Sequence, residues 1–163
     1  MVLDADGMNA FADNPGVLHQ VQKQIILTPP PGEMVRLTGV SSTQEIQSRR
    51  LEVSQLFVRG RANVTLVLKG HQTLVMNEEK FYVNTTGNPG MATAGAGDVL
   101  TGMISAFLGQ NYTPFDAAQL GVYLHGLAGD LAAREVGEIS LIATDILDNL
   151  PKAFMVYREN SCI

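Results

Sequence analysis

The sequence has few charged residues, a single cysteine, and no apolar run long enough to cross a bilayer. The lone Cys162 excludes a disulfide within the chain. The eleven Lys and Arg residues are scattered, apart from Arg49-Arg50 and the pair Arg59 and Arg61. These arginines are expected to line a solvated helix face and its end, so no basic stripe favours nucleic acid. Because a signal-peptide pattern is also lacking, we expect a cytoplasmic protein with neither a membrane nor a nucleic-acid partner.

The low charged fraction also bears on assembly. Of the 163 residues, 45% are hydrophobic and 17% are charged, and the net charge is −5. A single domain of this length can bury a substantial core, but it carries fewer charges than a typical free-standing domain. Much apolar surface must be covered by sequence outside this chain or by partner subunits. We therefore expect a homo-oligomer.

The most informative stretch is NTTGNPGMATAGAGDVLTGMISAFLG, residues 84–109. Between Gly87 and Gly97 it holds four glycines and no charged side chain, and Asp98 follows. Apolar residues then recur at helical spacing: Val99, Leu100, Met103, Ile104, Phe107 and Leu108. The pattern predicts a small-residue loop that leads into a helix N-terminus, where free N–H groups and the helix dipole can hold an anion. Asp98 either caps this helix or, beside a bound phosphate, takes a proton from an attacking hydroxyl.

Short apolar runs and helical patterns alternate along the rest of the chain. Strands are predicted over residues 2–5, 24–28, 63–69, 73–77 and 81–84. Helices are predicted over residues 9–22, 42–59, 113–136 and 144–154, with a frayed tail from 158. Ser42 begins a capping box, Thr113-Pro114 begins the longest helix, and Pro151 is expected to bend the last one. No internal repeat and no cluster of metal-ligating residues is apparent.

Several polar residues are candidates for a site. Asp4 and Asp6 flank Ala5, where the first strand gives way to a loop, and carboxylates there either meet a ligand in an open sheet or serve as turn and cap. Lys69 ends a buried strand, where an unpaired ammonium would be costly, so it should meet a phosphate or a carboxylate. His71 lies in a turn and is expected to be exposed. His125 lies in an apolar helical stripe and is predicted to be a packed, hydrogen-bonded core histidine rather than a ligand.

Three glycines in the helix predicted over 113–136, namely Gly121, Gly126 and Gly129, indicate close packing of that helix. Glycine leaves room for a neighbouring backbone to approach.

The stretch NTTGNPGMATAGAGDVLTG resembles, almost residue for residue, the C-terminal signature of the ADP/ATP-dependent NAD(P)H-hydrate dehydratases of the ribokinase-like superfamily. Other segments agree in the same order: VLDADGMNA, LTPPPGEMVRL, LVLKG and GVYLHGLAGDLAA. The resemblance covers essentially the whole chain but only about the second half of a family domain. It implies that residues 1–163 are the C-terminal portion of one ribokinase-like three-layer α/β/α sandwich, and that the chain starts mid-domain.

The resemblance also implies a repair reaction. ADP or ATP would phosphorylate the added hydroxyl of hydrated NADH or NADPH (NADHX or NADPHX), and loss of phosphate would regenerate the cofactor. Asp98 would be the base, the backbone of Gly95 to Gly97 would stabilise the transferring phosphoryl, and Mg²⁺ would bridge the phosphates with few protein ligands. The implied nucleotide-binding residues are Lys69, Gly70, His71, Gln72, Thr73, Thr85, Thr86, Gly87, Asn88 and Gly97. The implied substrate-binding residues are Asp4, Asn9, Pro30, Glu33 and Asp98.

One position departs from the family pattern, which usually reads Thr-Pro-His-Pro-Gly-Glu where this chain has Pro30 in place of the histidine. The change removes a donor and acceptor that would face the substrate, so weaker substrate affinity is expected. Two alternatives to the repair reaction stay open. One is a ribokinase-like kinase that phosphorylates a vitamin-precursor alcohol without elimination, and the other is a non-catalytic nucleotide-binding fragment.

Overall fold

The computed structural model describes residues 1–12 and 15–161. Within these residues, five strands form one mixed sheet in the order β1-β2-β3-β4-β5. The strands are β1 (Val2–Leu3), β2 (Ile25–Leu27), β3 (Val64–Leu68), β4 (Leu74–Met76) and β5 (Phe81–Val83). β1, β2 and β3 run parallel, whereas β4 and β5 are each antiparallel to the preceding strand. The carboxyl ends of the first three strands therefore meet at one edge of the sheet.

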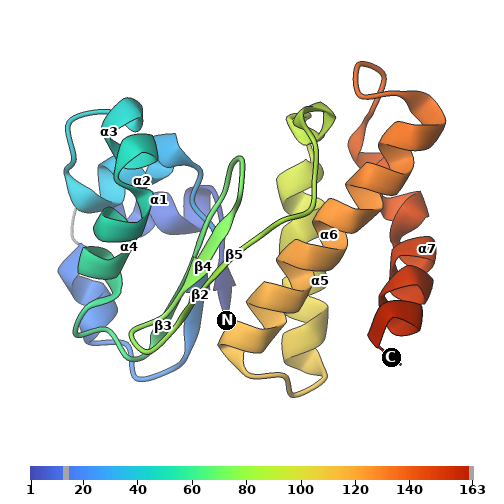
Figure 1. The fold of residues 1–163 in the computed structure, drawn as a ribbon. Helices are drawn as coiled ribbons and strands as arrows, with labels where there is room; N and C mark the ends of the chain where they lie inside the picture. Colours follow the sequence, from blue (N-terminus) through green and yellow to red (C-terminus); the bar gives the residue numbers. More distant parts are fainter. Residues whose placement is uncertain (13–14, 162–163) are drawn as a thin grey trace.

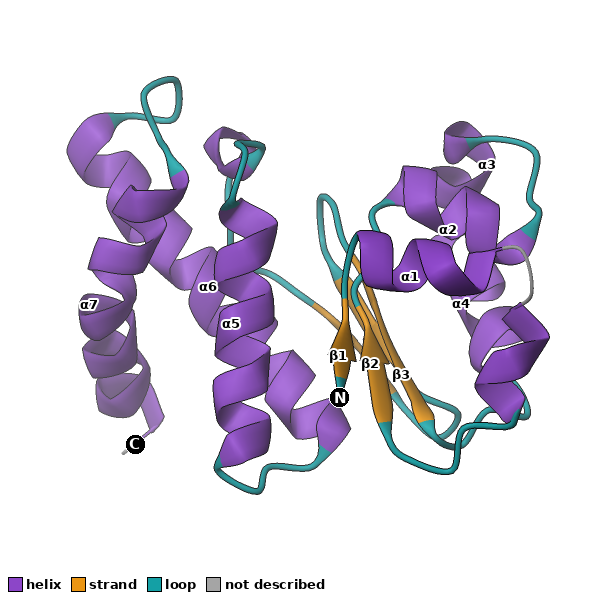
Figure 2. Cartoon of the chain, turned by 180° about the vertical axis from the view of Figure 1, so that it is seen from behind, coloured by secondary structure: helices purple, strands orange, loops and turns teal. Residues whose placement is uncertain are grey.

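Helices cover both faces of the sheet (Figure 1). One face carries α1 (Asp6–Ala12), α2 (Pro31–Thr38), α3 (Thr43–Ser48) and α4 (Arg50–Val58). The other face carries α5 (Ala96–Gly109) and α6 (Pro114–Val136), and α7 (Ala143–Ser161) packs outside them. Figure 2 shows the same layers from behind, with β1, β2 and β3 side by side. The predicted three-layer α/β/α arrangement is confirmed.

The central strands β2, β3 and β4 are buried on both faces, each face in its own apolar cluster, whereas β5 is largely exposed. Ile26 of β2 packs in the cluster with α5, α6 and α7, whereas its neighbours Ile25 and Leu27 pack in the cluster with α2 and α4. Successive side chains of a strand point to opposite faces, so burial of both faces requires a continuous apolar run. This requirement explains why the strands could be predicted from their composition. No helix among the described residues is both long and apolar enough to cross a membrane.

The predicted strands are confirmed, with ends displaced by one or two residues, but three predicted helices differ. The helix predicted over 9–22 is wrong: α1 begins at Asp6 and ends at Ala12, and the 3₁₀ turn η1 (Pro15–His19) follows. Proline cannot donate an N–H inside a helix, so Pro15 does not continue α1. The helix predicted over 42–59 is interrupted at Arg49, which has φ −122° and ψ 31°.

The last helix is longer than predicted. α7 continues through Ser161 with Pro151 inside it, so residues 158–161 are helical rather than a frayed tail. The final two residues of that tail, 162 and 163, lie outside the described part of the chain. Helix starts agree better, because they depend on local capping. Ser42 accepts the backbone N–H of Glu45 at 3.2 Å, and Thr113 accepts that of Asp116 at 3.2 Å.

Candidate functional site

The carboxylate of Asp4 joins three elements at the carboxyl edge of the sheet. Its Oδ1 accepts hydrogen bonds from Thr28 Oγ1 at 2.8 Å and Lys69 Nζ at 2.9 Å, and its Oδ2 accepts one from Thr101 Oγ1 at 3.1 Å. Thr28 and Lys69 follow the neighbouring strands β2 and β3, and Thr101 lies on α5. Burial raises the pKa of Asp4, but hydrogen bonds from Lys69, Thr28 and Thr101 and the charge of Lys69 outweigh it and hold the pKa below its usual value. Asp4 is therefore an ionised anchor between the sheet and α5.

The N-terminus of α5 lies directly beside this anchor. Gly95 is its N-cap, with φ 85° and ψ −15°, a left-handed conformation that favours glycine. A Cβ atom added at Gly97 would lie 3.4 Å from Lys69 Nζ and 3.9 Å from Asp4 Oδ2. The positive end of the α5 dipole and the ammonium of Lys69 thus lie together, and both attract anions. Asp98 is exposed in the same turn.

A cavity of about 640 Å³ opens next to this turn, within the size range of small-molecule sites. All ten residues implied for nucleotide binding line it, from Lys69 to Thr73, from Thr85 to Asn88, and Gly97. Leu100 and Val122 add apolar surface. The structure thus brings together residues that the sequence places in three separate segments.

The first cavity segment, residues 69–73, is supported by a residue that sequence reasoning placed wrongly. Arg50 was expected on a solvated helix face, but it is half-buried and donates to the carbonyl of Leu68, at 2.9 Å, and to that of His71. The break before α4 makes this possible, because it places Arg50 at the start of the helix, opposite the end of β3. His71 is exposed, as predicted.

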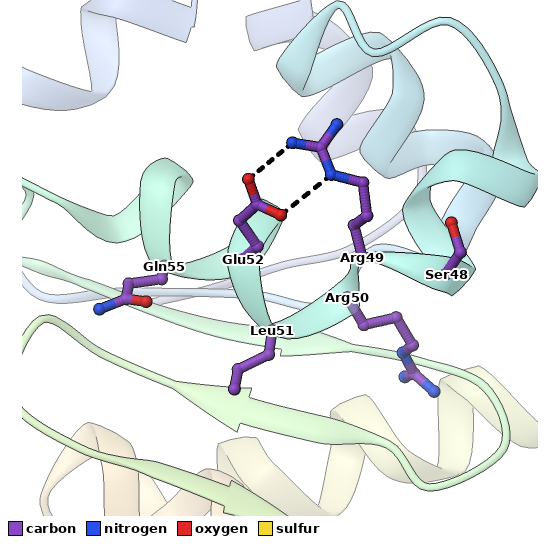
Figure 3. Close-up of a pocket in the computed structure, with 6 residues that line it drawn as sticks. All are labelled: Ser48, Arg49, Arg50, Leu51, Glu52 and Gln55. Atoms are coloured by element: carbon purple, nitrogen blue, oxygen red, sulfur yellow. Dashed lines mark hydrogen bonds and ion pairs between the residues drawn. The ribbon is translucent and has the colours of Figure 1, made fainter.

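Figure 3 shows the open pocket of about 320 Å³ at the start of α4. Arg49 behaves as expected of a solvated arginine and pairs with Glu52 at 2.6 Å and with Glu45 at 2.7 Å. The side chain of Arg50 extends away from that pair (Figure 3). Adjacent arginines therefore have different surroundings, one in water and one against the backbone of the cavity wall.

The second cavity segment, residues 84–88, is held in place by hydrogen bonds of the buried Asn84 amide and of Thr86. The side-chain amide of Asn84, which is buried, donates to the Thr86 carbonyl at 2.9 Å, and its oxygen accepts from Tyr82 at 3.1 Å. Thr86 Oγ1 donates to the carbonyl of Tyr123 on α6 at 2.8 Å. These bonds fix the loop against α6.

The predicted close packing at the α6 glycines is confirmed, although the loop takes part as well as a helix. A Cβ at Gly121 would lie 2.7 Å from Ile104 of α5. A Cβ at Gly126 would lie 2.7 Å from the Thr86 carbonyl carbon, and one at Gly129 would overlap Met91. The helix backbone thus touches the wall of the cavity.

Asp130 of α6 contacts the same loop and was not singled out from the sequence. Its Oδ2 accepts the Gly87 backbone N–H at 2.9 Å, and its Oδ1 accepts Asn88 Nδ2 at 3.0 Å. The sequence feature that could have identified Asp130 is its position one turn after Gly126, on a helix face rich in glycine.

The residues implied for substrate binding are less closely grouped. Glu33, in the first turn of α2, has a raised pKa because of burial, and lies near enough to Lys69 and Asp4 to feel their charges. Its Oε2 is buried with no hydrogen-bond partner among the described residues. Asn9 is exposed and accepts a bond from Arg36 at 2.8 Å.

Pro30 occupies the N-cap position of α2, where its carbonyl accepts the Glu33 N–H at 3.0 Å. The pyrrolidine ring can neither donate nor accept a hydrogen bond. This position therefore presents only an apolar ring beside Glu33.

His125 lies at the cavity wall rather than wholly within the core. Burial lowers its pKa to about 4, while a hydrogen bond with the backbone of Ala96 acts in the opposite direction. The imidazole is therefore neutral at physiological pH. The Nε2 atom of His125 is buried with no hydrogen-bond partner among the described residues, so neither the full hydrogen bonding nor the seclusion from the cavity that the sequence led us to expect is found.

Known proteins are similar to this chain over most of its length. The family described as NAD(P)H-hydrate dehydratase matches residues 1–152. The bifunctional NAD(P)H-hydrate repair enzyme Nnr of Moorella thermoacetica is 48% identical over 151 residues, 92% of this chain and 28% of that protein. The ADP-dependent (S)-NAD(P)H-hydrate dehydratase of Neisseria meningitidis is 40% identical over 140 residues, 84% of this chain and 47% of that protein.

A solved structure extends the comparison to the fold. The ADP/ATP-dependent NAD(P)H-hydrate dehydratase of Bacillus subtilis, co-crystallised with ATP and Mg²⁺, has a TM-score of 0.80 at 33% identity. The match covers 96% of this chain and 54% of that one. The chain thus spans between 28% and 54% of the length of these three relatives. The fold is ribokinase-like, and the chain belongs to the NAD(P)H-hydrate dehydratase family.

Proposed function

We propose that this chain is the C-terminal portion of one ribokinase-like domain that dehydrates NADHX or NADPHX with ADP or ATP. The observation that carries the proposal is the convergence of Lys69, the N-terminus of α5 and the cavity of about 640 Å³. A lysine and free helix N–H groups bind phosphate, and the cavity is large enough for a small ligand. The names of the relatives supply the substrate class.

The nucleotide occupies the cavity in this proposal. Residues 69–73 and 85–88 hold it from two sides, and its phosphates reach the first turn of α5 at Gly97. Lys69 lies at the junction of the two regions, with its ammonium 2.9 Å from Asp4. Its charge is thus oriented before the anion arrives, which lowers the cost of binding.

The chemistry is assigned to the first turn of α5. Asp98 takes the proton of the substrate hydroxyl, and the freed oxygen bonds to the terminal phosphorus as the bond to the bridging oxygen breaks. AMP leaves from ADP, or ADP from ATP. The backbone N–H groups of Gly95 to Gly97 stabilise the charge on the transferring group. Loss of the new phosphate, with a proton from the adjacent carbon, restores the double bond of NADH or NADPH.

In this proposal Mg²⁺ has few protein ligands. Among the residues that the structure describes, no three His, Cys, Asp or Glu side chains lie close enough to hold a metal ion. This fits an ion that takes most of its ligands from phosphates and water, as Mg²⁺ commonly does. When bound, Mg²⁺ neutralises part of the phosphate charge.

The substrate lies on the side of Asp4 and Glu33. Asp98 contacts it at the reacting hydroxyl, and Asn9 and Pro30 border it more distantly. The raised pKa of Glu33 and its buried, unpaired Oε2 single out a carboxyl whose hydrogen-bonding capacity is not used by the described residues. Pro30 contributes no polar contact, which supports weak substrate affinity and keeps the non-catalytic fragment as a second candidate.

One experiment tests these assignments together. The chain is incubated with NADHX, Mg²⁺ and either ADP or ATP, and both NADH absorbance and the released nucleotide are followed. The proposal expects AMP or ADP to appear with NADH in equal amounts. Release of nucleotide with a vitamin-precursor alcohol, and none with NADHX, would indicate the kinase. Nucleotide binding without turnover in any mixture would indicate the non-catalytic fragment.

We also propose that the chain self-associates. Large apolar side chains are exposed on α7, including Leu147 at 51% and Met155 at 62%. Exposed apolar side chains that lie together favour burial in an interface. Size-exclusion chromatography with light scattering tests this, and a monomer at all concentrations would contradict it. The cytoplasmic location expected from the sequence stays a prediction.

A further inference from the structure

We propose that Asp130 is a positioning residue for the nucleotide site. Its carboxylate fixes the loop at Gly87 and Asn88, and thereby sets the shape of one cavity wall. Asp130 does not itself line the cavity, so it acts through the residues it holds. The assignment of the ligand as a nucleotide rests on the function proposed above.

Both oxygens of the carboxylate are used, and each bonds to a different part of the loop. Oδ2 accepts the backbone N–H of Gly87 at 2.9 Å, and Oδ1 accepts Nδ2 of Asn88 at 3.0 Å. Hydrogen bonds to an ionised acceptor are roughly twice as strong as those between neutral groups. The pair of bonds fixes the main chain and a side chain of the loop at once.

The bond to Gly87 holds a backbone conformation that few residues adopt. Gly87 has φ 101°, and a Cβ there would lie 3.3 Å from the sulfur of Met91. An external acceptor for its N–H stabilises this turn against the more open forms that glycine allows. Without the acceptor, the wall at Gly87 is expected to move.

The bond to Asn88 sets the direction of its amide. Nδ2 faces the carboxylate, so Oδ1 faces away from it and accepts the backbone N–H of Gly90 at 3.1 Å. That bond caps the 3₁₀ turn η2 (Pro89–Met91), which continues the wall of the cavity. Asp130 thus also fixes η2 indirectly, through the orientation of the Asn88 amide.

A short side chain can make these contacts only because α6 lies close to the loop. Gly126 lies one turn before Asp130 on the same helix face, and a Cβ there would lie 2.7 Å from the Thr86 carbonyl carbon. A Cβ at Gly129 would overlap Met91. Gly126 and Gly129 therefore let α6 approach the loop closely, and Asp130 provides the hydrogen bonds to it.

The geometry allows a test by exchange of the two side chains. In Asp130→Asn alone, the oxygen of the introduced amide can accept the Gly87 N–H only if its NH₂ group faces Nδ2 of Asn88. Both of those groups are donors, so the second hydrogen bond is lost. In the double variant Asp130→Asn with Asn88→Asp, the introduced carboxylate accepts that donor and still accepts the Gly90 N–H. The net charge of the chain is unchanged in the double variant.

Affinity for ADP with Mg²⁺, measured by calorimetry, is expected to fall about tenfold in Asp130→Asn and to recover most of the loss in the double variant. Hydrogen exchange at the Gly87 amide should be faster in the single variant and near normal in the double. Asp148→Asn removes the same charge at an exposed position of α7 and should change neither quantity. If Asp130→Asn proves poorly folded, Asn88→Ala provides a second test. This variant leaves α6 intact and should also weaken binding.

Normal affinity in Asp130→Asn or in a folded Asn88→Ala, or no recovery in the double variant, would overturn the inference alone. An unsubstituted chain that binds neither ADP nor ATP would instead overturn the proposed function, and the inference with it.

Discussion

Lys69 Nζ lies 2.9 Å from Oδ1 of Asp4, and the two side chains are only 21% and 15% exposed. The alternatives raised by the sequence, a phosphate or a carboxylate as the partner of this lysine, are thus not exclusive. Asp4 compensates the ammonium in the protein, and Lys69 and Gly97 both line the cavity of about 640 Å³. A phosphate entering that space would meet a lysine that is already oriented.

Replacement of the lysine should affect stability and ligand binding together. Lys69→Met keeps much of the side-chain volume but leaves the carboxylate of Asp4 with hydrogen bonds only from hydroxyl groups. We expect a loss of about 1–3 kcal/mol in the free energy of unfolding, because the pair is only partly buried, and at least a tenfold loss of affinity for ADP with Mg²⁺. Urea unfolding and calorimetry measure the two effects.

The exposed pair of Lys152 and Glu135 provides the matched control for that variant. Lys152→Met should change stability by less than about 1 kcal/mol, since exposed pairs contribute little. Equal stability and affinity in both variants would show that Lys69 is neither a structural partner of consequence nor a phosphate ligand.

Asp98→Asn should separate binding from catalysis. Asparagine is nearly isosteric but cannot take a proton, so we expect nucleotide affinity within a few fold of normal and turnover lowered by about 10²–10⁴. Asp116→Asn, which alters a first-turn acid of α6, should leave turnover unchanged. The comparison requires a preparation whose unsubstituted form is active, and near-normal turnover of Asp98→Asn there would reduce Asp98 to a helix cap.

Pro30→His should tighten substrate binding. The position is at the N-cap of α2 with φ −73° and ψ 168°, a conformation that histidine adopts without strain. One added hydrogen bond of about 1 kcal/mol corresponds to a several-fold lower KM for NADHX or NADPHX. Nucleotide affinity serves as the internal control and should not change. An unaltered substrate KM would place residue 30 away from the substrate.

His125 predicts a specific loss of stability in acid. Its pKa is about 4 in the folded chain and about 6.5 when unfolded. Between these values the unfolded chain binds a proton that the folded chain does not. The contribution of the neutral His125 to the free energy of unfolding is therefore fully present above pH 6.5. It is lost as the pH drops towards 4, and the loss amounts to about 3 kcal/mol at most. Urea unfolding at several pH values should show this slope, and His125→Gln should flatten it.

The exposed His71 supplies the control for the pH series. His71→Gln should retain the slope between pH 6.5 and 4. A slope that survives in His125→Gln would assign the acid sensitivity to another group.

Local chemistry explains which elements could be predicted from the sequence. β2, β3 and β4 are buried on both faces, so they appear as apolar runs. Helix starts at Ser42, Thr113 and Gly95 depend on residues within a turn of each cap. Such signals extend over four or five residues and need no knowledge of the rest of the chain. The glycine-rich segment before α5 belongs to the same class.

The sequence by itself thus indicated the strands and the candidate loop at α5, and its resemblance to a known family implied the three layers. Only the tertiary structure decided the contacts between them. Asp4 and Lys69 are 65 positions apart, Asp130 and Gly87 are 43 apart, and Arg50 and His71 are 21 apart. Local propensity cannot assign such partners, because many acids and bases along the chain have the same local pattern. They are selected by the parallel pairing of the strands and by the close approach of α6, which bring particular side chains to one edge of the sheet.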